Sequence, residues 1–236
     1  MERPIIFSAP MVTAILHGKK TVTRRIVKQV ESASSVSPRS TQPTLSLGAE
    51  MAEATIESLP ARLLHSTERC PYGRQGDVLW LKETFYAYGR WEARFNRGVN
   101  REEWRFLDTT LSSGMNYQYA QPADYLKTSR SDPRPGWWRR SNVFMPRRAS
   151  RISLEITYVH KERLRDITDE QAIAEGFTAL HNGTHGYFAN HLPPPNAGIS
   201  TTPVIAFAVF WQSLNGAESW EENPWVWVVG FRRITS

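Results

Sequence analysis

Residues 15–25 read Ile-Leu-His-Gly-Lys-Lys-Thr-Val-Thr-Arg-Arg and connect the end of a predicted helix to the start of a predicted strand. We expect the helix over residues 10–17, because proline suits its first turn and Gly18 suits the position just beyond its last turn. Residues 22–27 then alternate as a strand does. This order of helix, short turn and strand is typical of a mixed α+β fold.

The same stretch is cationic. No acidic residue lies between Glu2 and Glu31, so no neighbour in sequence neutralises its five cations, which are Lys19, Lys20, Arg24, Arg25 and Lys28. A cationic turn that also carries hydroxyl groups suits an anionic or nucleotide-like ligand. The alternative interpretation is a solvated basic turn with no ligand.

Hydrophobic periodicity predicts the remaining elements. The most regular strand is residues 151–159, where one face is expected to hold Ile152, Leu154, Ile156 and Tyr158. In the helix expected within residues 164–177, Thr168 and Gln171 have capping-box spacing and Gly176 ends the helix. Further strands are expected at residues 4–9, 78–81 and 225–234, with an amphipathic helix at 203–214.

Three segments lack a clear period and read as loop-rich insertions, at residues 31–66, 87–140 and 178–200. The first has room for a short helix at residues 49–59. The strands that remain are well separated in sequence, and small mixed β-barrels with helices at the rim have this order. We therefore expect a single α+β domain over residues 1–236, built as a mixed β-barrel with flanking helices.

Composition narrows the class of protein. Hydrophobic residues make up 40% of the chain and charged residues 22%, as in a soluble globular protein. No apolar run reaches membrane-spanning length and no signal peptide is evident, so we expect a cytoplasmic protein without a membrane partner. The single cysteine, Cys70, excludes an intramolecular disulfide and any zinc site with several cysteines.

The net charge of +6 favours acidic partners such as RNA or DNA, and its distribution is uneven. Residues 127–151 carry eight cations against one acidic residue, Asp132, whereas residues 166–222 are mostly acidic. Aromatic side chains beside cations can stack on bases. Candidate nucleic-acid contacts are Lys19, Arg24, Arg25, Trp138, Arg139, Arg140, Arg147, Arg148 and Arg151. For the last three, a phosphate clamp and a solvated surface are equally good interpretations.

Several segments, taken together in their order and spacing, resemble the ASCH domains of the PUA-like superfamily. They resemble a phage- and prophage-encoded ASCH-like family more closely. The matching segments cover about half of the chain and are residues 3–11, 15–25, 71–85, 145–151, 167–176 and 223–231. The resemblance implies a PUA-like β-barrel that acts on RNA or nucleotides, although kinship of fold rarely settles function.

Some small ASCH proteins are amidohydrolases that remove the acetyl group of N4-acetylcytidine with a Lys-Thr-Glu trio. Carried over by position, the resemblance places these roles on Lys20, Thr23 and Glu175. Amide hydrolysis needs a nucleophile, a base and a proton donor for the leaving amine. Thr23 would be the nucleophile, Lys20 a base with a lowered pKa, and Glu175 the acid.

Other functions remain open at this stage. The same pocket could read a modified base without catalysis, or the chain could be a ribonuclease, as some ASCH proteins are. A structural role in a phage is a further alternative. We expect no metal and no cofactor, because His181, His185 and His191 lie in a Gly/Pro-rich loop without an adjacent carboxylate.

Overall fold

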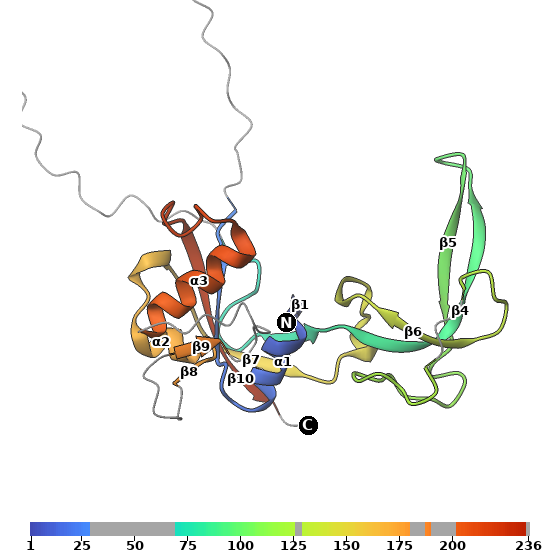
Figure 1. The fold of residues 1–236 in the computed structure, drawn as a ribbon, viewed down its shortest axis with the longest axis horizontal. Helices are drawn as coiled ribbons and strands as arrows, with labels where there is room; N and C mark the ends of the chain where they lie inside the picture. The colour runs from blue at the N-terminus through green and yellow to red at the C-terminus, as the bar shows by residue number, and fades with distance from the viewer. Residues whose placement is uncertain (29–68, 126–128, 180–186, 190–201, 235–236) are drawn as a thin grey trace, which may run out of the picture. The chain divides into compact units, whose positions relative to one another are not determined.

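The computed structural model describes residues 1–28, 69–125, 129–179, 187–189 and 202–234 (Figure 1). The chain divides into two units, residues 1–27 with 70–236, and residues 28–69. Almost all of the second unit lies outside the described residues. The predictions of an insertion at 31–66 and a helix at 49–59 therefore lie outside the described residues. The three loop histidines, His181, His185 and His191, also lie outside the described residues.

The described elements alternate between strands and a few helices. In chain order they are β1 (Glu2–Ile6), α1 (Ala9–Leu16), β2 (Val22–Ile26), β3 (Val78–Lys82), β4 (Phe85–Asn96), β5 (Arg101–Asp108), β6 (Gly136–Arg140), η1 (Asn142–Phe144), η2 (Arg147–Ala149), β7 (Ser153–Arg163), η3 (Leu164–Asp166), α2 (Asp169–Ala174), β8 (Phe177–Ala179), β9 (Tyr187–Ala189), α3 (Pro203–Asn215) and β10 (Trp225–Ile234). This confirms a mixed α+β fold.

The main sheet has five strands in the order β1-β3-β7-β10-β2. β1 and β3 are parallel, and the other neighbours are antiparallel. β1 and β2 are edge strands, so over the described residues the sheet is open. The expectation of a closed barrel is therefore wrong. Among the described strands, β1 pairs with β3 and β2 pairs with β10, and no pairing joins β1 to β2.

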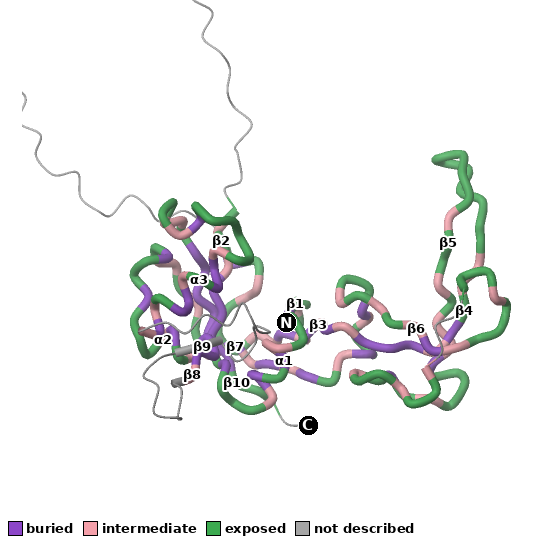
Figure 2. The backbone as a smooth tube through the Cα atoms, in the orientation of Figure 1, coloured by how far each residue is buried: buried purple, intermediate pink, exposed green. Residues whose placement is uncertain are grey.

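Two hydrophobic clusters pack against the two faces of this sheet. Figure 2 shows the buried stretches along its central strands. On one face, Val12 and Ile15 of α1 pack with Leu154 and Ile156 of β7. On the other face, aromatic residues of α3 and the buried Ala172 of α2 pack against Val226 and Val228. The candidate site lies on this second face, between the sheet and the two helices.

A β-bulge in β7 changes which side chains face α2. Ile156 pairs with Phe231, but the next β10 partner, Gly230, pairs with Tyr158, so Thr157 has no partner. An unpaired extra residue reverses the alternation beyond it. The predicted series that put Tyr158 on the same face as Ile156 is therefore wrong, because Ile156 lies in the first cluster while Tyr158 lies over Gly230 on the opposite face.

The segment expected to be a loop-rich insertion at residues 87–140 forms a second sheet, of order β5-β4-β6. The expectation of a loop is therefore wrong for residues 87–96, 101–108 and 136–140, which lie in the strands of this sheet. β4 and β5 pair from Gly89↔Asp108 to Asn96↔Arg101. The alternation of apolar and polar residues in β4 is weak, because Ala87, Gly89 and Ala93 dilute its apolar face and Tyr86 and Tyr88 lie on its other face among charged residues.

Candidate functional site

Lys20 is a fully buried cation at the end of the turn that follows α1. Gly18 adopts φ of 70°, which lets the chain turn there, and the backbone N–H groups of Lys19 and Lys20 both donate to Ala14 O. The next residue, Thr21, donates its N–H to Ala174 O at 2.8 Å, which fixes the turn against the end of α2. The Lys20 side chain is thereby directed at Glu175.

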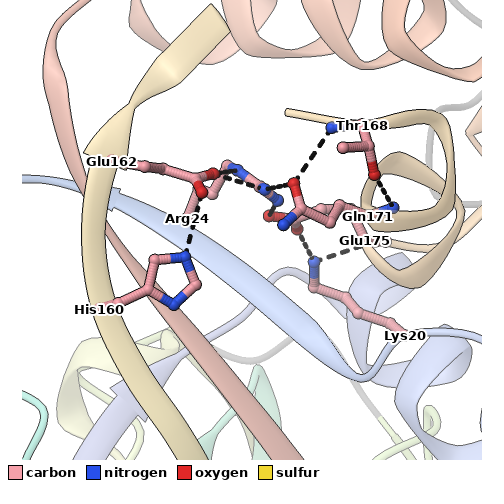
Figure 3. Close-up of polar contacts among 7 residues, drawn as sticks. All are labelled: Lys20, Arg24, His160, Glu162, Thr168, Gln171 and Glu175. Atoms are coloured by element: carbon pink, nitrogen blue, oxygen red, sulfur yellow. Dashed lines mark hydrogen bonds and ion pairs between the residues drawn. The ribbon is translucent and has the colours of Figure 1, made fainter. Parts of the chain in front are cut away.

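Glu175 receives two hydrogen bonds from Lys20 Nζ, one at its carboxylate Oε2 and one at its backbone oxygen, at 3.0 Å (Figure 3). The residues are 2% and 3% exposed, so the ion pair is shielded from water. Glu175 follows the last residue of α2 as its C-cap. A cation at this position satisfies a free carbonyl and interacts favourably with the helix dipole.

Arg24 extends this pair into a larger cluster. Its guanidinium donates to Glu162 Oε1 at 2.7 and 3.0 Å, to Gln171 Oε1 at 2.7 Å and to Glu175 Oε1 at 3.4 Å. Its side chain is fully buried. We call Lys20, Arg24, Glu162, Gln171 and Glu175 the Lys20 cluster. The cluster holds two cations and two carboxylates, so its formal charge is balanced.

The elements of the fold account for this convergence. Arg24, on β2, is paired with Val228, and Val228 is paired with His160 of β7, so these three side chains lie on one face. The β-bulge puts Glu162 on that face as well. Gln171 is held by the predicted capping box, which is present: Thr168 accepts from Gln171 N, and Gln171 Oε1 accepts from Thr168 N at 3.1 Å.

His160 connects the cluster to the surface. Its Nε2 lies 3.0 Å from Glu162 Oε2, and its side chain is 44% exposed (Figure 3). The imidazole stacks on Tyr158, with ring centroids 5.7 Å apart. A chain of hydrogen bonds therefore runs from a solvent-exposed imidazole through Glu162 and Arg24 to the buried ion pair.

Burial lowers the pKa of Lys20, against the opposing effect of the Glu175 carboxylate, which raises it. The nearby guanidinium groups of Arg25 and Arg24 lower the pKa further. The sequence-based expectation was a Lys20 pKa below its ordinary range, and the structure gives the same direction. The amine therefore releases its proton more readily than a surface lysine does.

Thr23 is buried on β2, but it faces away from the Lys20 cluster. Successive residues of a strand point to opposite faces, so Thr23 points away from the face that carries Arg24. It pairs with Val229, a member of the cluster around α1. Among the described residues, no hydrogen bond joins its hydroxyl to Lys20 or Glu175. The structure thus brings together two members of the predicted trio and leaves the third apart.

The basic residues fall into different environments. Lys19 is exposed, whereas Arg25 donates to Ile6 O at 2.7 Å and lies over the Phe7 ring. Arg24 belongs to the buried cluster, so its guanidinium is turned away from solvent. The turn therefore presents fewer free cations than its sequence suggests.

The Arg147, Arg148 and Arg151 guanidinium groups all meet carboxylates. The pairs are Arg147–Glu2 at 2.9 Å, Arg148–Asp108 at 3.2 Å and Arg151–Glu83 at 2.9 Å. A phosphate bound here would compete with these carboxylates. Hydrogen bonding by Arg147 holds the pKa of Glu2 below its usual range, so this competitor stays ionised at neutral pH.

The Trp-Arg segment is part of β6. Trp138 donates its indole N–H to Gly89 O at 3.0 Å and packs edge-on against Trp91. The Arg140 guanidinium lies 4.5 Å from the centre of the Phe106 ring. The Trp138 ring and the Arg140 guanidinium are therefore already engaged in contacts within the protein. Arg139 lies on the other face of β6 and is exposed.

Sequence analysis did not select Glu162 or His160, and it treated Gln171 only as a cap. His160 and Glu162 are two residues apart on β7, but the β-bulge that places them on the face of Arg24 is not evident from the sequence. Among the residues described, no group of three or more His, Cys, Asp or Glu side chains is arranged to hold a metal ion. None of the described helices has the length and apolar character needed to cross a membrane.

Comparison with known proteins returned no match among protein-family models, curated proteins or solved structures.

Proposed function

We propose that this chain is a PUA-like protein of the ASCH type that acts on a modified nucleobase, as an amidohydrolase that removes an acyl group from N4-acylated cytidine. The observation that carries the proposal is the contact between Lys20 and Glu175, two residues that the resemblance selects and that lie 155 positions apart in the chain. Nothing in their local sequence requires them to meet.

The burial of this pair supports a functional role. Removing a lysine and a glutamate from water costs several kcal/mol for each ion, and their attraction often does no more than offset this cost. Two apolar residues of similar volume would hold the same space at least as well. A buried pair with a perturbed pKa is therefore a candidate for chemistry.

The proposed reaction cleaves the bond between the acyl carbonyl carbon and N4 of cytosine. A nucleophile adds to the carbonyl carbon, the C–N bond breaks, and N4 takes up a proton, which releases cytidine. With water as the nucleophile the other product is the carboxylic acid. With Thr23 it is an acyl-enzyme ester, which water then hydrolyses to the carboxylic acid and the free threonine hydroxyl. Lys20 accepts the proton of the nucleophile once its amine is neutral. Glu175 relays a proton to the leaving N4.

The nucleophile is either the Thr23 hydroxyl or a water molecule. For Thr23 to attack, substrate binding has to bring its hydroxyl within hydrogen-bond reach of Lys20, about 2.6–3.2 Å. Thr23→Ala distinguishes the two routes, because it abolishes turnover only if the hydroxyl itself forms the acyl-enzyme. Thr23→Val keeps the shape of the side chain and is the matched control for packing.

The test is incubation of the protein with N4-acetylcytidine, as the nucleoside and within an RNA oligomer, with products followed by mass spectrometry. Lys19→Ala is the matched control for Lys20→Ala, since it removes an exposed cation from the adjacent position. Release of cytidine by the wild type and by Lys19→Ala, but not by Lys20→Ala, is the expected result. Intact substrate in all samples would refute the amidohydrolase, and shortened RNA would favour the ribonuclease.

A second candidate is a non-catalytic protein that binds RNA, DNA or a modified base. The exposure of Lys19 and Arg139 favours it, as does the closed ion pair, in which Lys20 is already neutralised by Glu175. Binding through phosphates would weaken steeply with salt, and Arg139→Ala would reduce the salt slope by about one unit. Unchanged affinity in this variant would argue against a phosphate contact at Arg139.

A further inference from the structure

The hairpin of β4 and β5 has two unlike faces. Cross-strand partners share a face, and one face carries Glu92↔Arg105 and Arg94↔Glu103. The opposite face is mainly apolar, with Glu102 and Asp108 at its ends, and includes Phe95 and Trp104, which are 59% and 43% exposed. Figure 2 shows β5 as largely exposed or half-buried. An apolar sheet face of this kind is unusual on the surface of a single chain.

β5 is also the edge strand of this described sheet. Thr109, the residue after β5, donates its N–H to Tyr88 O at 2.9 Å, so the backbone groups of Thr109 point toward β4. Directions alternate along a strand, and the N–H and C=O groups of Glu102, Trp104 and Phe106 therefore point away from β4. An edge with such groups is a template for another strand.

We propose that β5 pairs antiparallel with β5 of a second copy of this chain, about a two-fold axis at Trp104. The two copies would then form a continuous sheet across the interface. In this register the facing pairs are Trp104 with Trp104, Glu103 with Arg105, Glu102 with Phe106 and Arg101 with Leu107. A two-fold interface is self-complementary, so each unlike pair occurs twice.

Hydrogen bonding and charge together select this register. The backbone N–H and C=O groups of Glu102, Trp104 and Phe106 point away from β4. They can bond across the interface only in registers where each of these residues faces a residue whose groups also point outward. Centring the axis on Glu103 would set Glu103 against itself and Arg101 against Arg105. Centring it on Arg105 would set Arg105 against itself and Glu102 against Asp108. Like charges directly opposite destabilise a sheet, and larger shifts shorten the ladder.

The Trp104-centred register instead places opposite charges together on the charged face. Glu103 of each copy faces Arg105 of the other, while the two Trp104 side chains meet on the apolar face. Aromatic cross-strand pairs and opposite-charge pairs are both favourable. The contact satisfies the unpaired edge of β5, and each Trp104 side chain covers part of the other.

A charge-exchange experiment tests the register. Alone, Glu103→Arg would face Arg105 with like charge and Arg105→Glu would face Glu103 with like charge, so each variant should self-associate about tenfold more weakly than the wild type. An equimolar mixture restores both opposite-charge pairs in a heterodimer. Sedimentation equilibrium on the full chain should show twice the monomer mass for the wild type and for the mixture.

Each variant also loses contacts within its own chain, since Glu103 accepts hydrogen bonds from Arg101 and Asn96. Circular dichroism establishes whether both variants fold. Mixing the two variants does not change how either one folds, so recovery of the dimer in the mixture reports on the contact between the chains. A wild type that is monomeric at every concentration would overturn the proposal. A dimer that neither variant weakens, or that the mixture does not restore, would overturn the register.

Disulfide trapping gives an independent measurement. Hydrogen-bonded partners in an antiparallel pair lie about 5.5 Å apart at Cα, within the range of a disulfide, so Trp104→Cys should be cross-linked to itself by mild oxidation. In the matched control Arg101→Cys, the two cysteines would be displaced by six residues, about 20 Å along the strands. Cross-linking of the control as readily as of Trp104→Cys would contradict the proposed axis.

Discussion

Replacing Glu175 by glutamine should destabilise the fold strongly at neutral pH and much less at alkaline pH. Lys20 is 2% exposed and its cation is neutralised by the Glu175 carboxylate. The amide of the variant can still accept a hydrogen bond, but it carries no charge. Lys20 must then either stay charged without its partner or lose its proton on folding.

The second route sets the size of the effect. Burial lowers the pKa of Lys20 while Glu175 raises it, so removing the carboxylate lowers this pKa further. The unfolded chain keeps an ordinary lysine pKa of about 10.4, and releasing its proton at pH 7 costs at most about 4.6 kcal/mol. At pH 9 the same ceiling is about 1.9 kcal/mol.

The sign follows from the protons bound in each state. In the variant the unfolded chain binds a proton that the folded chain has released, so the free energy of unfolding rises with pH, by up to about 1.4 kcal/mol per unit. Arg24 keeps Glu162 and Gln171 as partners, so losing its longer contact with Glu175 adds little. We expect a loss of about 3–5 kcal/mol at pH 7 and recovery of about half of it at pH 9.

Urea unfolding at pH 7, 8 and 9, followed by tryptophan fluorescence, measures the free energy. The matched control is Lys20→Met combined with Glu175→Gln, which has no lysine to titrate and should lack the additional pH slope. The double variant should also be more stable than Glu175→Gln at pH 7. A single variant within about 0.5 kcal/mol of the wild type, or with the same slope as the double variant, would refute the argument.

Three further predictions follow from other contacts. Gly230→Ala should lower stability by about 1–3 kcal/mol, because the added methyl group would collide with the Tyr158 ring; removing that ring with Tyr158→Ala should restore part of the loss. Gly89→Ala should cost a similar amount, but its methyl group would meet the backbone oxygen of Leu107, so truncating a side chain should not rescue it; urea unfolding measures both. Cys70 is buried and its thiol pKa is raised by burial, so a thiol reagent at pH 8 should modify it slowly in the folded protein and rapidly in urea; fast modification without urea would contradict its burial.

Local signals in the sequence predicted much of the main sheet and its helices. The helix expected at residues 10–17 is observed as Ala9–Leu16, and the strand at 225–234 has the predicted bounds. The capping box of α2 is confirmed with both of its hydrogen bonds. These features depend on residues that are near one another in sequence, where propensity and capping chemistry act directly.

The failures share a physical cause. The bulge at Thr157 depends on how β7 aligns with β10, and the pattern of β7 itself is as regular before it as after it. The second sheet was missed because Ala87, Gly89 and Ala93 weaken the apolar face of β4, and its other face mixes Tyr86 and Tyr88 with charged side chains. Both features are decided by how one strand pairs with another, and the pattern of a single strand does not fix that pairing.

The candidate site was predicted in part for the same reason. Lys20 and Glu175 were named through the resemblance, and the structure places them in contact. Glu162 and His160 could not be named, because their approach to Arg24 requires β10 to lie between β7 and β2 in one particular alignment. The charged partners of Arg147 and Arg151 are likewise set by tertiary contacts.

The strand order of the main sheet bears on how the chain folds as it is synthesised. β2 is made early, but within the sheet its neighbour is β10, which is the last described strand to leave the ribosome. A growing chain must therefore carry β2, and the basic turn before it, without its partner in the described sheet until residues 225–234 have been made. Contacts between such distant segments form slowly. The long interval without pairing exposes the nascent chain to aggregation, so chaperone binding during synthesis should fall on its first strands.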